Sequence, residues 1–174
     1  MNEPTIAARH ADVAHRPSID IRRADLPRDL AVVRELFREY ASTLGIDLCF
    51  QNFEDELRDL PGKYAAPRGC ILLAWDGDRP AGCVALRPVD EERAEMKRLF
   101  VRAAHRKHGL GRQLAERICD EARQAGYRAI CLDTLGTMTA AVALYTQLGF
   151  VPIAPYVFNP LAGALFFGRR LLET

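Results

Sequence analysis

Residues 93–112, RAEMKRLFVRAAHRKHGLGR, concentrate the groups of this chain that are best suited to binding a polyanion. They are typical of a strand that ends in a basic, glycine-containing turn and leads into an amphipathic helix. Consecutive backbone N–H groups at a helix N-terminus bind phosphate or pyrophosphate. The basic residues of the turn are Arg102, Arg106, Lys107, His108 and Arg112. This combination favours a polyanionic cofactor, and the chemistry that it favours is acyl transfer from coenzyme A, provided that the rest of the chain supports it.

Two other kinds of glycine turn are excluded by the residues that follow Gly109-Leu110-Gly111. The dinucleotide pattern G-x-G-x-x-G requires a third glycine, and Leu114 stands in its place. A Walker A loop would end in Gly-Lys-Ser or Gly-Lys-Thr, and this turn has no such ending. Both failures argue against a nucleotide-binding protein. The remaining alternative is a plain turn at the start of a helix, without a ligand.

Seven strands and four helices are predicted to position this turn. The strands are expected over residues 19–22, 70–76, 80–88, 93–101 and 127–133, from residue 150, and over 164–170. The first helix is expected after Asp25, with Pro27 in its first turn, and ends before Gly45; the others are expected from Asn52 to Pro61 and over 110–125 and 139–148. Asp25 and Asn52 are predicted to cap the first two helices. Residues 1–18 have no sustained period and are expected to be a mobile tail before a single domain of residues 19–174.

Composition limits the class of protein. At 174 residues the chain is long enough for one domain with a real core. Its net charge of +1 gives no overall attraction to nucleic acid or to a membrane surface. No apolar run approaches the roughly 18 residues of a membrane span, and the N-terminus lacks the apolar stretch of a secretory signal. We therefore expect no nucleic-acid partner and no membrane partner.

The cysteines indicate a reducing compartment. Their number is odd, and no two are spaced as a C-x-x-C unit. They are Cys49, Cys70, Cys83, Cys119 and Cys131. Most of them lie in apolar strand or helix patterns, where free cysteine behaves as a small hydrophobe. We expect a cytoplasmic protein without disulfides and without a bound metal.

Four motifs and the order of the elements carry a resemblance to a known family. The turn has the spacing Arg106-x-x-Gly109-x-Gly111, after the strand Glu95–Val101. The segments Leu144-Tyr145-x-x-Leu148-Gly149-Phe150 and Tyr156-x-x-Asn159-Pro160 follow. Over about residues 19–170 the chain resembles a bacterial subgroup of the GNAT superfamily of N-acetyltransferases. This resemblance implies an α/β (α+β) GNAT fold, with a twisted, mixed and mostly antiparallel sheet of about seven strands. About four helices would flank it, and its central parallel pair would splay.

The resemblance also implies which residues bind acetyl-CoA. Unpaired backbone groups of Leu99, Phe100 and Val101 would bind the pantetheine arm where the strand splays from residues 131–133. The pyrophosphate would lie on backbone N–H groups between Lys107 and Arg112, with charge-assisted contacts from Arg106 or Arg112. The intervening residues are His108, Gly109, Leu110 and Gly111. A Cβ atom at either glycine would block the close approach of the backbone.

Two catalytic residues are implied as well. Tyr145 corresponds to the tyrosine that protonates the coenzyme A sulfur in many members of the family, and its alternative role is that of a core aromatic residue. Glu95 is the candidate base, acting through a water. It lies four residues before Leu99, so strand alternation places both side chains on the same face, toward the cleft. The alternative is a solvated carboxylate paired with Arg93 or Lys97. His105 and His108 are weaker candidates.

The function expected from this resemblance is acetyl-CoA-dependent acetylation of a primary amine on a small molecule or peptide. The alternative is a catalytically silent domain that binds coenzyme A. The expected partners are acetyl-CoA and the amine acceptor, and the resemblance is compatible with a homodimer. The two N-terminal helices and the 152–163 loop are expected to shape the acceptor pocket.

Overall fold

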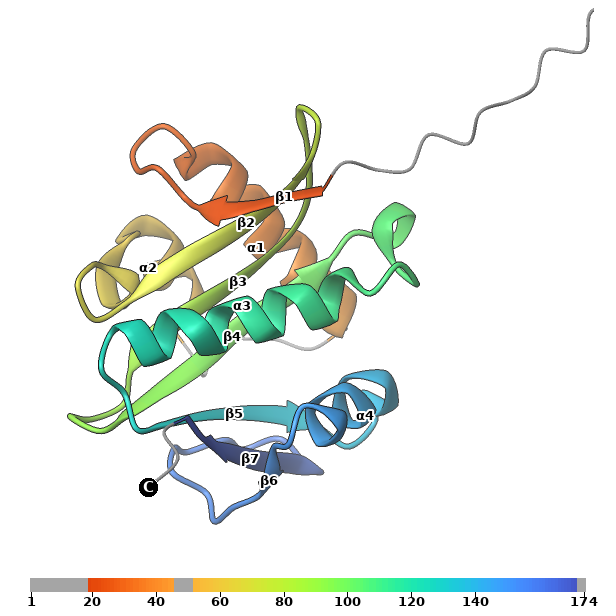
Figure 1. Cartoon of the computed structure of the whole chain (residues 1–174). Helices are drawn as coiled ribbons and strands as arrows, with labels where there is room; N and C mark the ends of the chain where they lie inside the picture. The colour runs from red at the N-terminus through yellow and green to blue at the C-terminus, as the bar shows by residue number, and fades with distance from the viewer. Residues whose placement is uncertain (1–18, 46–51, 172–174) are drawn as a thin grey trace, which may run out of the picture.

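The computed structural model describes residues 19–45 and 52–171, so the predicted 1–18 tail lies outside the described residues. These residues form a seven-stranded sheet in the order β1-β2-β3-β4-β5-β7-β6 (Figure 1). The strands are β1 (Ile19–Arg23), β2 (Cys70–Asp76), β3 (Arg79–Pro88), β4 (Arg93–Val101), β5 (Ala129–Leu135), β6 (Val151–Pro152) and β7 (Ala164–Arg170). The α-helices are α1 (Leu30–Leu44), α2 (Phe53–Arg58), α3 (Leu110–Gln124) and α4 (Thr139–Gln147). The predicted order of strands and helices is confirmed.

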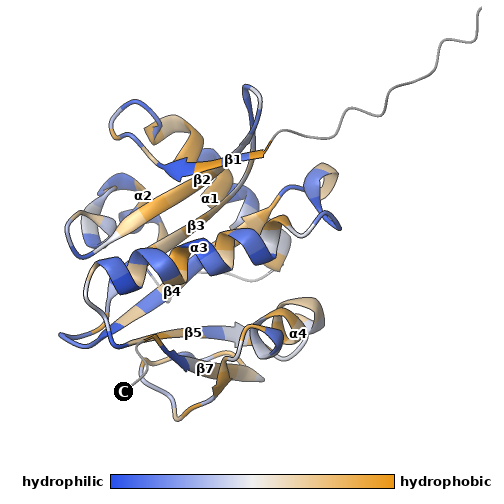
Figure 2. Cartoon of the chain, in the orientation of Figure 1, coloured by the Kyte–Doolittle hydropathy of each residue, from blue (hydrophilic) through white to orange (hydrophobic). Residues whose placement is uncertain are grey.

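Helices cover both faces of the sheet, and each face has its own apolar core. On one face Leu72 and Val84 pack with Leu114 of α3 and with residues of α4. On the other face Leu73 and Cys83 pack with α1 and α2. Successive residues of a strand point to opposite faces, so a strand covered on both sides is apolar along its length. Figure 2 shows this pattern in β2, whereas α3 is hydrophobic along one stripe only.

The parallel pair β4–β5 separates partway along its length, as predicted. The two strands pair only at Arg93↔Ala129, Ala94↔Ile130 and Glu95↔Cys131. β4 then runs on to Val101 and β5 to Leu135 without further pairing between them. The backbone groups that face the resulting gap lack ladder partners, which makes the gap a natural place for a ligand to add hydrogen bonds.

A bulge in β4 changes which side chains share a face. Between Cys83↔Phe100 and Ala85↔Lys97 the register leaves one extra residue on β4. Arg98 accommodates it with a left-handed φ of 59°. Leu99 therefore packs on the α3 face, whereas Glu95 pairs with Arg87 on the face of α1 and α2. The prediction that Glu95 and Leu99 share a face is wrong, because it assumed unbroken alternation.

The helix starts also differ in detail from the prediction. The N-cap residue of α1 is Asp29 rather than Asp25. Its carboxylate accepts hydrogen bonds from Arg22 and from the backbone N–H of Asp25, not from the helix. Asn52 is the N-cap residue of α2, but its side chain makes no capping hydrogen bond. Neither helix therefore has the side-chain capping hydrogen bond that the sequence pattern suggested.

The cysteines that the structure describes are buried free thiols in the two cores. They are Cys70, Cys83, Cys119 and Cys131, while Cys49 lies outside the described residues. Burial raises the pKa of the Cys119 thiol to about 11, so it stays protonated and unreactive near neutral pH. Within residues 19–45 and 52–171 no helix is long and apolar enough to cross a bilayer. The same ranges contain no group of three or more His, Cys, Asp or Glu placed to hold a metal ion.

Candidate active site

The gap between β4 and β5 contains a pocket that is lined by residues from both faces of the sheet. Its walls come from both splayed strands, from α1 and α4, and from the segment between β6 and β7. The lining residues are Tyr40, Leu44, Met96, Lys97, Arg98, Leu99, Asp133, Thr134, Leu135, Met138, Ala141, Tyr145, Asn159 and Leu161. The predicted residues Leu99 and Tyr145 are therefore brought together in one pocket, although 46 positions separate them in the sequence (145 − 99).

Tyr145 is held by α4 with its ring against Phe150, the two centroids 5.8 Å apart. The residue is 7% exposed, yet it lines the pocket. Among the described residues, no protein group is hydrogen-bonded to its hydroxyl. Burial raises the pKa of this phenol above its ordinary value of about 10. The hydroxyl therefore keeps its proton near neutral pH and has that proton available for a ligand.

The three predicted strand positions occupy different surroundings. The Leu99 side chain lines the pocket. The Phe100 side chain is buried in the core beneath α1. Val101 is half-buried at the end of β4, and its carbonyl accepts a hydrogen bond of 2.9 Å from Nε of Arg106. Only backbone groups of Phe100 and Val101 can therefore serve a ligand in the gap.

The basic turn leads from β4 into α3 through two left-handed residues, Lys107 with φ 69° and Gly109 with φ 76°. The first hydrogen bond of the α3 ladder runs from the Gln113 N–H to the Gly109 carbonyl, at 3.1 Å. The N–H groups of Leu110, Gly111 and Arg112 precede this bond and have no partner within the helix. The buried Leu110 side chain fixes the helix start in the core. The turn therefore has the geometry of an anion-binding helix N-terminus.

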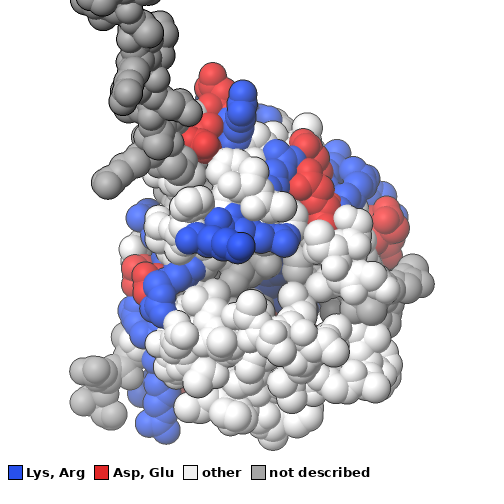
Figure 3. Space-filling model, turned by 90° about the vertical axis from the view of Figure 1, so that its right-hand side faces the viewer, with Lys and Arg blue, Asp and Glu red and all other residues white. Residues whose placement is uncertain are grey.

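Charge gathers beside this turn. Figure 3 shows Lys and Arg side chains across the middle of the face where the segment between β4 and α3 lies, above a hollow. The surface below the hollow, at the level of α4, is largely uncharged. Arg106 is exposed, and Arg112 donates to Oε1 of Gln147 on α4 at 2.9 Å. A polyanion at the turn would thus meet positive charge on one side and neutral surface on the other.

Substitution at Gly111 separates ligand binding from folding. A Cβ atom there would lie 3.8 Å from Leu144 Cδ2 and 3.9 Å from Val101 Cγ2, which is ordinary contact. Gly111→Leu should therefore fold, but its side chain should obstruct the approach of pyrophosphate to the α3 N-terminus. We expect acetyl-CoA binding to weaken at least tenfold, or about 1.4 kcal/mol, by titration calorimetry. Gly136→Ala, whose Cβ also has room, is the control. Unchanged affinity in folded Gly111→Leu would remove the turn from the site.

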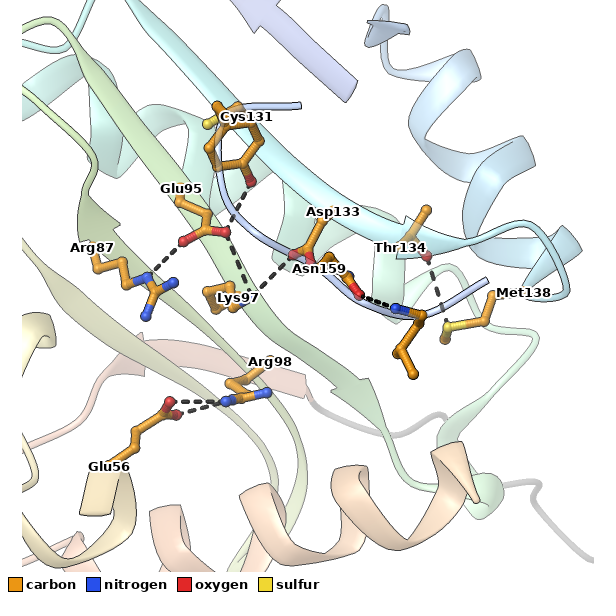
Figure 4. Close-up of polar contacts among 12 residues, drawn as sticks. Glu56, Arg87, Glu95, Lys97, Arg98, Cys131, Asp133, Thr134, Met138 and Asn159 are labelled. Atoms are coloured by element: carbon orange, nitrogen blue, oxygen red, sulfur yellow. Dashed lines mark hydrogen bonds and ion pairs between the residues drawn. The ribbon is translucent and has the colours of Figure 1, made fainter. Parts of the chain in front are cut away.

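Glu95 lies in a buried network instead of the pocket lining. The residue is 1% exposed, and its carboxylate accepts hydrogen bonds from Arg87 Nε at 2.6 Å and from the Tyr156 hydroxyl at 2.8 Å. Lys97 Nζ lies 3.5 Å away. The carboxylate is therefore buried rather than solvated. Of the two partners expected for it, Lys97 lies beside it, whereas Arg93 pairs with Asp90. Figure 4 shows Glu95 between Arg87 and Lys97.

Two further ion pairs of the pocket were not predicted from the sequence. Lys97 Nζ lies 2.9 Å from Asp133 Oδ1 and joins the splayed strands just beyond the end of their ladder. Arg98 donates to both carboxylate oxygens of Glu56 on α2, at 2.9 and 2.8 Å. Burial alone would raise the pKa of Asp133, but Lys97 and Asn159 lower it. Arg98 likewise outweighs burial at Glu56 and lowers the pKa of that carboxyl. Both carboxylates therefore stay ionised at neutral pH.

The two histidines near the turn lie apart from this pocket. Nε2 of His105 is 3.3 Å from the Asp76 carboxylate at the far end of β2. His108 lines a separate hollow together with His105 and Gln113. Neither imidazole is among the side chains that surround the gap. Neither is placed to accept a proton there.

Known proteins resemble the chain in sequence. The model of the acetyltransferase (GNAT) family matches residues 30–150. An uncharacterised N-acetyltransferase of Schizosaccharomyces pombe is 40% identical over 154 residues, which cover 87% of this chain and 94% of the relative. An IAA acetyltransferase of Azospirillum brasilense is 36% identical over 160 residues, which cover 89% of this chain and 99% of that protein. Similar proteins thus occur in both eukaryotes and bacteria.

Solved structures resemble it in fold. A GNAT-family acetyltransferase of Staphylococcus aureus superposes with a TM-score of 0.73 at 21% identity, covering 89% of this chain and all of that one. The Salmonella typhimurium acetyltransferase yncA, solved with its cofactor acetyl-CoA, superposes with a TM-score of 0.69 at 21% identity. The superposition covers 90% of this chain and 95% of that one. The family match spans both splayed strands, the basic turn and Tyr145. The chain therefore belongs to the acetyltransferase (GNAT) family.

Proposed function

We propose that this acetyltransferase transfers the acetyl group of acetyl-CoA directly to a primary amine of a small molecule or peptide. The observation that carries the proposal is the gap between β4 and β5. Along it lie unpaired strand backbone, the Tyr145 hydroxyl and, at one end, the N-terminus of α3. The yncA structure with acetyl-CoA supports the choice of donor.

Two sets of backbone groups would hold acetyl-CoA. The N–H groups between Lys107 and Arg112 would bind the pyrophosphate, with added charge from Arg106. The backbone from Leu99 to Val101 would pair with the amides of the pantetheine arm, because β5 does not pair with it there. In this structure Arg106 donates a hydrogen bond to the Val101 carbonyl. When its side chain turns to the phosphates, that carbonyl would become available to the pantetheine arm.

The chain's own groups supply the two charge-stabilising steps of acyl transfer. Acetyl-CoA brings an activated acyl group with a thiolate leaving group. The backbone N–H of Leu99, beside the Arg98 bulge, is proposed to donate to the oxygen on which negative charge develops. Tyr145 is proposed to give its proton to the departing sulfur. The raised pKa of Tyr145 suits this role, since the phenol is fully protonated at neutral pH.

The proton that the acceptor amine loses has two proposed destinations. One is Glu95 through a water, but this carboxylate is already bonded to Arg87 and Tyr156 and does not line the pocket. The other is solvent water at the mouth of the pocket. We favour water, with Glu95 as the residue that positions Tyr156.

Glu95→Gln distinguishes these roles. As a positioning residue, Glu95 can be replaced with a moderate loss of rate and with the same dependence of kcat/KM on pH, because the base is unchanged. As the base, its loss should lower kcat by about 10²–10⁴-fold and remove the ionisation seen on the acid side of the profile. A pH profile of kcat/KM for parent and variant decides between the two.

A screen of amines, amino acids and peptides with acetyl-CoA tests the proposal as a whole. Thiol release that depends on the amine, with mass spectrometry showing one added acetyl group, is the expected result. Acetyl-CoA binding measured by calorimetry, without turnover on any amine, would instead indicate a catalytically silent domain.

A further inference from the structure

The segment between β6 and β7, residues 153–163, is fixed against the splayed strands although it has no regular secondary structure. Its Tyr156 hydroxyl donates to Glu95 Oε1 of β4 at 2.8 Å. Its Asn159 Nδ2 donates to Asp133 Oδ2 of β5 at 2.8 Å, and Asn159 Oδ1 accepts from the Leu161 N–H at 3.0 Å. Figure 4 shows Asn159 beside Asp133. These hydrogen bonds therefore hold the segment in place as one wall of the pocket.

These anchors belong to a network in which every charge is matched. Its three pairs are Arg87 with Glu95, Lys97 with Asp133 and Arg98 with Glu56. The side chains of Lys97 and Asp133 are each 7% exposed, and that of Arg98 is 1% exposed. Among the described residues, three cations thus meet three carboxylates in and beside the pocket, each within 3 Å of its partner; Lys97, Arg98 and Asp133 line the pocket itself.

A ligand with a second charge would find no counter-ion in this network. Taking a carboxylate or an ammonium group out of water costs several kcal/mol unless a partner of opposite charge receives it. Each pair already satisfies its members, so an added charge would have to break one of them. The pocket should therefore reject acceptors that carry a charge besides the reacting amine.

The acceptor side of the pocket offers apolar surface instead. Tyr40 and Leu44 of α1 and Leu161 of the 153–163 segment line it. Phe158, next to the anchor Asn159 and outside the pocket lining, is 81% exposed, the highest value among the large hydrophobic side chains of the described residues. An exposed aromatic ring on an anchored segment is suited to pack on an apolar group of a ligand.

From these contacts we infer that the acceptor is a primary amine with an apolar, preferably aromatic, substituent and no second charge, recognised by the 153–163 segment. This inference rests on the proposed function, because it describes the acceptor of the same transfer. It assigns Leu161 and Phe158 to substrate selection, and Tyr156 and Asn159 to holding the segment in place.

The test compares 2-phenylethylamine with L-phenylalanine, which has the same skeleton plus a carboxylate, and with 1,5-diaminopentane, which carries a second ammonium group. We expect kcat/KM to be at least tenfold higher for 2-phenylethylamine than for either of the others. Equal or faster acetylation of L-phenylalanine or of the diamine would overturn the inference while leaving the acetyltransferase proposal intact. Turnover on no amine of the wider screen would overturn the acetyltransferase proposal instead.

Binding provides a readout that does not require turnover. Titration of the same three amines into the protein saturated with coenzyme A should show a dissociation constant at least tenfold lower for 2-phenylethylamine. No difference between the amines would contradict the inference whether or not transfer occurs.

Substitutions in the 153–163 segment test which residues select the acceptor amine. Leu161→Lys supplies the missing counter-ion and should shift the ratio of kcat/KM values toward L-phenylalanine by at least tenfold. Phe158→Ala should raise KM for 2-phenylethylamine severalfold without changing acetyl-CoA affinity. Val151→Ala, which shortens another exposed apolar side chain on β6, is its matched control and should change neither value. An unchanged amine preference in folded Leu161→Lys would place the acceptor elsewhere.

Discussion

Tyr145→Phe should lower kcat by about 10²–10⁴-fold, the usual contribution of a positioned general acid, while leaving folding and acetyl-CoA affinity near those of the parent. The phenylalanine ring keeps the contact with Phe150 and the buried position on α4. The change removes only the hydroxyl, which is hydrogen-bonded to no other described residue. The loss should therefore appear in the chemical step. Thiol release under saturating acetyl-CoA measures it, and calorimetry measures the affinity.

The pH dependence adds a second measurement. Because burial raises the pKa of Tyr145, the parent enzyme should lose no activity through its ionisation below about pH 10. Any loss at higher pH that comes from this phenol should be absent from Tyr145→Phe. Turnover of the variant at the parent rate would make Tyr145 a core residue and leave water as the proton source.

Glu56→Ala should lower the free energy of unfolding by about 3–5 kcal/mol, because it leaves the buried guanidinium of Arg98 without its carboxylate. Arg98 is fixed on the bulge, with its side chain 1% exposed between the rings of Tyr40 and Phe53. Urea denaturation measures the loss. Glu92→Ala is the matched control, because Glu92 pairs with Arg128 on the exposed surface. Loss of that pair should lower the free energy of unfolding by less than about 1 kcal/mol. Equal effects of the two substitutions would show that the Arg98–Glu56 pair adds no special stability.

Glu56→Gln tests the same pair through pH. The folded-state pKa of Glu56 is lowered, so its contribution is fully present above the unfolded-state pKa of about 4.3. That contribution is lost as pH falls through the folded-state value, where the carboxyl becomes neutral, like the amide that replaces it. The difference in unfolding free energy between parent and Glu56→Gln should therefore be constant near neutral pH and shrink below about pH 4. A difference that does not change with pH would contradict the ionic origin of the stabilisation.

Local patterns in the sequence were enough to predict most of the fold. The continuous apolar runs of β2 and β3 and the apolar stripe of α3 depend on neighbours a few residues apart, and all three elements lie close to where they were predicted. The pocket shared by Leu99 and Tyr145 followed from the resemblance to the family. The resemblance also implied the splay of β4 from β5.

What the sequence did not reveal depends on contacts between distant residues. The Arg98 bulge follows from the pairing of β4 with β3, and no glycine marks it in the sequence. Glu56 lies among the acidic residues of the first turn of α2, and nothing local in the sequence points to its partner Arg98, 42 positions away. Lys97 and Arg98, charged residues within a strand of otherwise buried pattern, were the available signal that buried counter-ions exist.

The short ladder between β4 and β5 has a consequence for how the protein resists unfolding. Three residue pairs and the Lys97–Asp133 bridge join the strands β1–β4 to the strands β5–β7. A ligand whose amides occupy the gap acts as an additional short strand between these two parts of the sheet. Its binding therefore raises the free energy of unfolding of the protein. At a concentration one hundred times its dissociation constant, such a ligand stabilises the fold by about 2.7 kcal/mol. The resistance of this enzyme to heat and proteolysis should therefore follow the concentration of its acyl donor.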